Sequence, residues 1–112
     1  MEKESKEKLK RMIQELQVLE QNYQQLLIQK NAFSMELNET EHTIEEVKKS
    51  KGKVSRIVGG SVVLQSTKEE VLSELDKRKS LISKRLEAIK KQEDELSKHI
   101  DEARSKIMEK ME

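Results

Sequence analysis

The first half of the chain carries apolar residues at alternating steps of three and four positions. The series begins at Leu9 and ends at Val47, and ten of its twelve positions are apolar, the exceptions being Lys30 and Thr40. This spacing is typical of the a and d positions of a coiled coil. Because the chain has no proline to interrupt the series, the pattern predicts one long helix over residues 1–50.

The second half repeats the pattern. Its series begins at Leu72 and ends at Ile107, and only Lys79 and Glu93 are polar within it. We therefore expect a second helix over residues 67–111. Residues suited to capping mark the helix ends. The candidates are Ser66 or Thr67 with Glu69 or Glu70 at the start of the second helix, and Lys48, Lys49 and Gly52 at the end of the first.

The two series mirror each other about one point in the chain. If the chain folds back between Gly59 and Gly60, residues whose numbers sum to 119 face each other. Ile44 then faces Leu75, and every a position meets a d position. An antiparallel coiled coil requires this arrangement, so the sequence predicts one.

The four polar residues of the predicted seam need a separate explanation. Thr40 falls opposite Lys79, and this shared layer either fixes the register or is a tolerated imperfection. Lys30 and Glu93 each face an apolar partner. We therefore expect their long side chains to reach out to water.

Residues 54–65, "VSRIVGGSVVLQ", differ from the rest of the chain because β-branched residues flank a Gly-Gly pair. This pattern predicts a β-hairpin with a two-residue turn at Gly59 and Gly60. The same sum of 119 gives its strand pairing. The expected pairs are Ile57 with Val62, Ser55 with Leu64, Arg56 with Val63, and Val58 with Ser61.

A lone hairpin of this kind lacks a core to cover its apolar side chains. Two-stranded hairpins are marginal in water, and this one would leave two open edges. The hairpin therefore predicts an obligate oligomer in which several chains pair as a barrel or small sheet; a simple valine-rich turn is the alternative. The residues expected to assemble the oligomer are Val54, Arg56, Ile57, Val58, Val62, Val63 and Leu64.

At the other end of the coiled coil, where both chain termini lie, the predicted seam weakens. Glu2, Ser5 and Lys110 fall at seam positions there, so we expect the tip to fray. Its apolar residues either finish the coiled coil or form an adaptable surface for apolar partners, to which methionine is suited. They are Leu9, Met12, Ile13, Ile100, Ala103, Ile107, Met108 and Met111.

Composition narrows the functional classes. Charged residues make up 40% of the 112 residues, yet the net charge is only +1, so no overall field attracts nucleic acid or an anionic membrane. There is no cysteine and no apolar run of membrane-spanning length. His42 and His99 fall at outward positions, and no catalytic, cofactor or metal motif is found. We therefore expect a cytoplasmic protein that is not an enzyme.

The order helix, short β-hairpin, helix resembles a beta-class prefoldin subunit over about residues 9–108. The resemblance rests on "YQQLLIQKNAFSMELNETEHTIEEVKK" and "RIVGGSVVLQSTKEEVLSELDKRKSLISKRLEAIKKQEDEL". Within them, "ELNE", the "VG" turn into "VV", and "KKQEDEL" are similar to beta-class sequences. The resemblance implies a single prefoldin-like domain over residues 1–112, all-α with a small β element.

The resemblance also implies a function. Prefoldin is a cytosolic hexamer of two alpha-class and four beta-class subunits, whose hairpins form a β-barrel body. Its coiled-coil tips hold unfolded proteins without ATP and deliver them to a group II chaperonin. The eight apolar tip residues would then touch unfolded clients, by which we mean the non-native proteins that a chaperone holds.

Two other functions stay open. Off-seam apolar residues suit a structural or adaptor coiled coil that recruits a folded partner; they are Leu27, Ile28, Met35 and Leu81. A helical arm that binds nucleic acid is disfavoured by the near-zero net charge.

Overall fold

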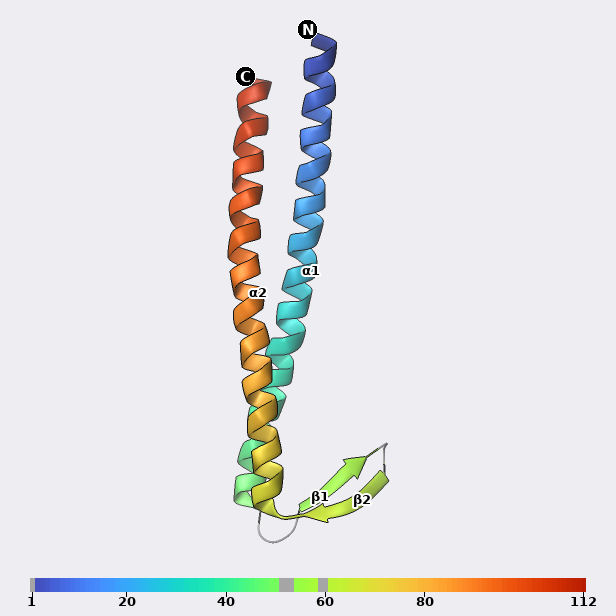
Figure 1. The fold of residues 1–112 in the computed structure, drawn as a ribbon, viewed down its shortest axis with the longest axis vertical. Coiled ribbons are helices and arrows are strands. Elements are labelled where there is room, and N and C mark those ends of the chain that lie inside the picture. Colours follow the sequence, from blue (N-terminus) through green and yellow to red (C-terminus); the bar gives the residue numbers. More distant parts are fainter. Residues whose placement is uncertain (1, 51–53, 59–60) are drawn as a thin grey trace. The chain divides into compact units, whose positions relative to one another are not determined.

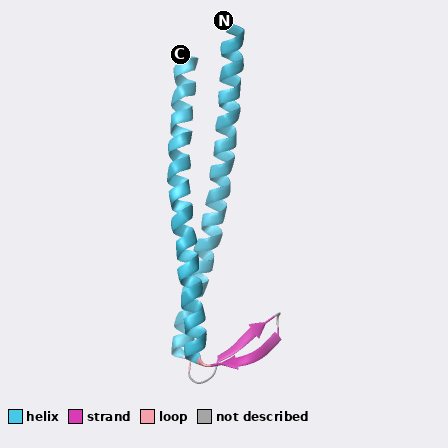
Figure 2. Ribbon diagram, viewed as in Figure 1, coloured by secondary structure: helices cyan, strands magenta, loops and turns pink. Residues whose placement is uncertain are grey.

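The described residues form two long helices and two short strands (Figure 1). A computed structural model describes residues 2–50, 54–58 and 61–112, with side chains over residues 2–50 and 67–112. The elements in chain order are α1 (Glu2–Lys49), β1 (Val54–Val58), β2 (Ser61–Ser66) and α2 (Lys68–Met111). Figure 2 separates the helices, in cyan, from the strands, in magenta. The two long helices predicted from the heptads are confirmed.

The start of α2 is fixed by a side-chain cap. The backbone N–H of Glu70 donates a hydrogen bond of 3.2 Å to Oγ1 of Thr67. Of the two predicted candidates, Thr67 is therefore the N-cap, since it satisfies one of the free N–H groups of the first turn. At the end of α1, Lys48 and Lys49 occupy the last turn as expected, whereas Gly52 lies outside the described residues.

The end of α1 is stabilised by a residue that sequence analysis did not single out. The ammonium of Lys68, the first residue of α2, donates hydrogen bonds to the carbonyl oxygen of Lys48 and, at 3.0 Å, to that of Ser50. The Ser50 hydroxyl also donates to the Val47 carbonyl at 2.7 Å. A cation is favourable at a helix C-terminus, where carbonyl groups lack partners within the helix.

Strands β1 and β2 pair in antiparallel fashion. Ile57 pairs with Val62 and Val58 with Ser61, in agreement with the predicted register. The pairs expected beyond these were wrong, because the register shifts between Arg56 and Ile57. Arg56 faces Leu64, and the remaining pairs are Ser55 with Gln65 and Val54 with Ser66. Val63 is the extra residue of a β-bulge, which increases strand twist; the turn at 59–60 lies outside the described residues.

The chain divides into two compact units. We call Met1–Asn31 with Glu87–Glu112 the terminal unit, and Ala32–Leu86, which includes the strands, the hairpin unit. Within each unit, a segment of α1 is paired with a segment of α2.

The hairpin unit has a continuous core to which both helices contribute. Its buried side chains are Thr40, Ile44 and Val47 on α1 and Ile82 and Leu86 on α2. The hydroxyl of Thr40 donates to the Glu36 carbonyl of its own helix at 2.8 Å. Burial of Thr40 therefore leaves no hydrogen-bonding group unpaired.

The predicted layer of Thr40 and Lys79 does not contain a bond between the two side chains. Lys79 is exposed and forms an ion pair with Glu41 at 3.8 Å. Exposed pairs of this kind contribute little stability. Of the two alternatives for this layer, the structure therefore favours a tolerated imperfection over a contact that fixes the register.

The terminal unit has a less complete core. Its buried residues are Ile89, Ile100 and Ile107, all on α2. The α1 seam residues of this unit are only half-buried; they are Leu9, Met12, Leu16, Leu19, Tyr23 and Leu26. The seam of the terminal unit is therefore more accessible to solvent on its α1 side than that of the hairpin unit.

Candidate functional site

A polar cluster crosses the seam of the terminal unit. Lys30 on α1 forms a 3.0 Å ion pair with Oε2 of Glu93 on α2. The hydroxyl of Tyr23 donates to Oε1 of the same carboxylate at 3.4 Å. The expectation that Lys30 and Glu93 would reach separately to water was therefore wrong. They lie about one helical turn from direct opposition, and their long side chains span that distance.

This cluster is partly sheltered from solvent. The side chains of Lys30 and Glu93 are 32% and 17% exposed. In such an environment a charge without its partner is costly. The pairing of a cation on one helix with an anion on the other therefore favours the observed register over a shifted one.

The predicted tip residues fall into three classes of exposure. Ile100 and Ile107 are buried, at 6% and 7% exposed, so of the two alternatives these residues finish the coiled coil. Both side chains pack inside a seam in which α1 extends to Glu2 and α2 to Met111. Leu9, Met12 and Ala103 are half-buried, whereas Ile13, Met108 and Met111 are exposed.

The three exposed tip residues offer apolar surface to a partner without any change of fold. Met108 and Met111 are 63% and 69% exposed, and Ile13 is 38% exposed. Methionine side chains are flexible and polarisable, so they adapt to apolar partners of different shape. Large apolar side chains are also exposed elsewhere on the helices; these are Val18, Ile28, Met35 and Leu81.

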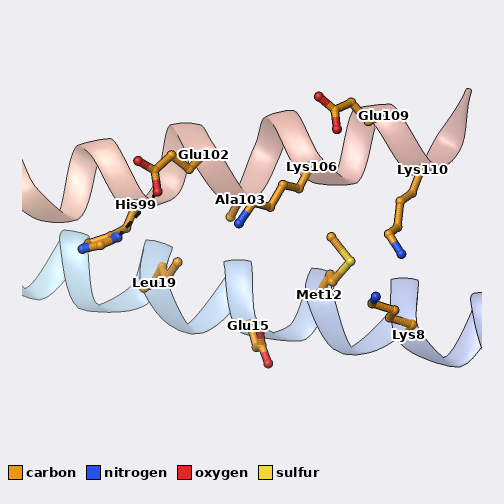
Figure 3. A pocket seen from close by; sticks show the side chains of 10 residues that line it. All are labelled: Lys8, Met12, Glu15, Leu19, His99, Glu102, Ala103, Lys106, Glu109 and Lys110. Atoms are coloured by element: carbon orange, nitrogen blue, oxygen red, sulfur yellow. Dashed lines mark ion pairs between the residues drawn. The ribbon is translucent and has the colours of Figure 1, made fainter.

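A groove of about 530 Å³ lies between the helices of the terminal unit (Figure 3). Its apolar lining comes from Met12, Leu19 and Ala103, which are half-buried seam residues. The groove exists because the α1 seam is incompletely covered here. Its polar lining residues are Lys8, Glu15, His99, Glu102, Lys106, Glu109 and Lys110.

Two lysines from different helices meet at one end of the groove. Figure 3 shows the side chains of Lys8 and Lys110 pointing toward each other. A hydrogen bond between the Lys8 and Lys110 side chains requires one amine to be uncharged, which lowers the pKa of Lys110 below its usual value, and loss of solvent and the like charge of Lys8 lower it further. Sequence analysis placed Lys110 opposite Leu9 but did not consider Lys8, although Lys8 adjoins Leu9 in the sequence.

The residues predicted to assemble the oligomer lie on the two strands. Val54, Arg56, Ile57 and Val58 belong to β1, and Val62, Val63 and Leu64 belong to β2. Their side chains lie outside the described residues. The strand pairing brings the two groups together along one hairpin.

The described part of the chain contains no arrangement for metal chemistry, since no three His, Cys, Asp or Glu side chains gather there. His42 and His99 are exposed and lie near Glu46 and Glu102 of their own helices. Within the same residues, neither helix has the length of apolar sequence needed to cross a bilayer.

Comparison with known proteins identifies the family. A family model described as prefoldin subunit matches residues 3–112. The chain belongs to the prefoldin subunit family. A crystal structure of the prefoldin beta subunit from Thermococcus strain KS-1 superposes with a TM-score of 0.84 and 25% sequence identity, over 91% of this chain and 90% of that one. A search of curated proteins finds no significant match.

These findings support a beta-class prefoldin, as the sequence resemblance implied. Prefoldin is a family of non-enzymatic chaperones that assemble with other prefoldin subunits. The paired helices therefore belong to a chaperone subunit, and the surfaces described above are candidates for its contacts with clients and with other subunits.

Proposed function

We propose that the chain is a subunit of an ATP-independent holdase, which captures unfolded proteins at the tips of its coiled coils and passes them to a group II chaperonin. The observation that carries this proposal is the exposed apolar surface of Ile13, Met108 and Met111 near the chain termini in a prefoldin-family chain. Unfolded proteins expose apolar side chains, and burying these against the tip is favourable.

Half-buried seam residues extend this surface into the groove. Met12 and Ala103 line it, and Met12 directly precedes the exposed Ile13 in the sequence. Each coiled-coil tip offers only a small apolar area, so the coiled coil of a single subunit, which we call an arm, binds a client weakly. Several arms acting on one client raise the overall affinity by their high effective concentration. The proposal therefore requires an assembly of arms.

The assembly we propose is a hetero-hexamer of two alpha-class and four beta-class subunits in the cytoplasm, joined by their hairpins into a β-barrel body. The sheet of this chain has two strands in the described residues, so each strand has one edge without a partner in the chain. Open edges favour pairing with further strands. The valines, isoleucine and leucine of β1 and β2 would gain a core in such a barrel.

Three experiments test this proposal. Co-expression with an alpha-class subunit of the same genome, followed by native mass measurement, should give a hexamer with two alpha-class chains. Ile57→Asp with Val63→Asp should leave a helical monomer. The hexamer should also keep a chemically unfolded protein soluble without nucleotide. If the unfolded protein aggregated as fast with the hexamer as without it, the holdase function would be contradicted.

A second candidate is an adaptor coiled coil that recruits a folded partner. The specific observation in its favour is the exposure of Ile28, Met35 and Leu81, at 68%, 65% and 52%, away from the tip residues in sequence. Leu27, which belonged to the same predicted set, is only half-buried. An adaptor would not suppress aggregation of an unfolded protein, so the same assay separates the two functions.

A further inference from the structure

The groove of the terminal unit combines apolar lining with paired cations. Met12, Leu19 and Ala103 supply the apolar lining, while Lys8 and Lys110 approach each other at one end. Figure 3 shows that the two ammonium groups come from facing helices and point into the space between them. The chain thus places two like charges together beside an apolar surface.

Neither lysine has an ion pair with a carboxylate among the described residues, although three glutamates line the same groove. Glu102 is paired with His99 at 4.0 Å. In Figure 3 the carboxylates of Glu15 and Glu109 lie on the outer sides of their helices, away from the ammonium pair. The two like charges therefore have no carboxylate ion-pair partner within this part of the chain.

A single anion between the two lysines would remove the repulsion between them. A carboxylate has two acceptor oxygens and can receive a charge-assisted hydrogen bond from each ammonium. A larger polyanion such as nucleic acid would bring further negative charge close to the three groove glutamates, which disfavours it. Charge complementarity thus selects an isolated carboxylate, and Met12, the apolar side chain that lies beside the pair in Figure 3, selects an apolar neighbour for it.

We propose that Lys8 and Lys110 form a seat for the side-chain carboxylate of an aspartate or glutamate that lies within an apolar stretch of a non-native polypeptide. This inference rests on the proposed holdase function and gives the tip a preference among clients. Apolar side chains next to the acid pack on Met12 and Ala103, and the acid fixes the segment at the end of the groove.

The test uses the full chain and three dye-labelled peptides with the same apolar sequence, with binding followed by fluorescence anisotropy. The first carries a central glutamate and a C-terminal amide, and the second replaces that glutamate by glutamine. We expect the glutamate peptide to bind about fivefold more tightly, which corresponds to about 1 kcal/mol. The third peptide carries glutamine and a free C-terminal carboxylate, and should bind like the second.

Two variants decide whether the seat is responsible. Lys8→Gln with Lys110→Gln should bind all three peptides equally. Lys91→Gln with Lys98→Gln is the matched control, since these exposed lysines of the same unit do not line the groove, and it should keep the fivefold preference. Circular dichroism should show the same helix content for both variants.

Three outcomes would overturn the inference alone, and a fourth would overturn the proposed function with it. Equal binding of the glutamate and glutamine peptides to the unaltered chain would remove the preference while leaving holdase function intact. Equal loss of preference in both lysine variants would reveal a general effect of charge. Tight binding of the third peptide would show that the two lysines bind the C-terminal carboxylate of a peptide and not an acidic side chain. If no peptide bound and aggregation were not suppressed, the proposed function would fail together with the inference.

Discussion

The hairpin unit and the terminal unit use the same heptad pattern but bury it to different degrees. In the hairpin unit both helices contribute buried residues, for example Ile44 and Ile82. In the terminal unit every buried residue lies on α2, and the α1 seam stays half-buried. The same spacing of apolar residues therefore buries side chains of both helices in one unit and of α2 alone in the other.

The difference is matched by the distribution of polar groups. In the hairpin unit the charged residues stay at the rim, where Arg78 pairs with Glu36 and the Arg85 guanidinium lies 5.6 Å from the centre of the Phe33 ring. In the terminal unit, Lys30 and Glu93 lie in the seam itself. Less complete apolar packing leaves a segment easier to open locally, which is consistent with the proposed capture of clients at the tip.

The largest expected effect tests the closed seam. Ile82 is 2% exposed, so Ile82→Ala should reduce the free energy of unfolding by about 3 kcal/mol through lost burial and a cavity. Leu16→Ala, at a half-buried seam position of the terminal unit, should cost about half as much. Urea denaturation followed by circular dichroism measures both.

The neighbouring Leu81 provides the control for this comparison. It is 52% exposed, so Leu81→Ala should change stability by less than about 0.5 kcal/mol. Equal costs for Ile82→Ala and Leu16→Ala would show that the two units are packed alike, contrary to the comparison above.

A smaller effect is expected at the polar cluster. Glu93→Ala leaves the Lys30 ammonium in the seam without its partner, which should cost about 1–3 kcal/mol. The double variant Lys30→Leu with Glu93→Leu should be as stable as the unaltered chain or more so, because apolar residues can replace such a pair. A double variant as unstable as Glu93→Ala would assign the loss to packing rather than to the unpaired charge.

The smallest effect concerns the start of α2. Thr67→Ala removes the hydroxyl that accepts from the Glu70 N–H and should cost about 1 kcal/mol in thermal unfolding. Ser66→Ala should have no measurable effect, because Thr67 supplies the cap. A loss of stability in Ser66→Ala but not in Thr67→Ala would show that Ser66 is the N-cap.

The sequence allowed much of this architecture to be predicted because coiled-coil geometry depends on local periodicity. The ion pairs between the helices bracket the predicted register, in which the numbers of facing residues sum to 119. The numbers of Glu36 and Arg78 sum to slightly less than this value, and those of Glu20 and Arg104 to slightly more. Thr67 was one of two N-cap candidates, and the hydrogen bond to Glu70 decided between them.

The remaining features depend on side-chain reach and on the path of the backbone. Lys30 and Glu93 do not face each other in the mirror register, and only their length brings them together. The β-bulge at Val63 depends on the path of the backbone, which the alternation of apolar and polar residues does not determine. The cap by Lys68 and the meeting of Lys8 with Lys110 join residues far apart in sequence, through long flexible side chains.

The most direct test of capture at the tip compares two triple variants in the proposed hexamer, each presented with a chemically unfolded protein in the absence of nucleotide. The first changes the exposed tip residues Ile13, Met108 and Met111 to serine. The second makes the same change at the exposed arm residues Ile28, Met35 and Leu81, and so removes a comparable apolar area. The account predicts that the first loses most of its suppression of aggregation and the second keeps it. Equal losses in both, or a greater loss in the second, would contradict capture at the tip.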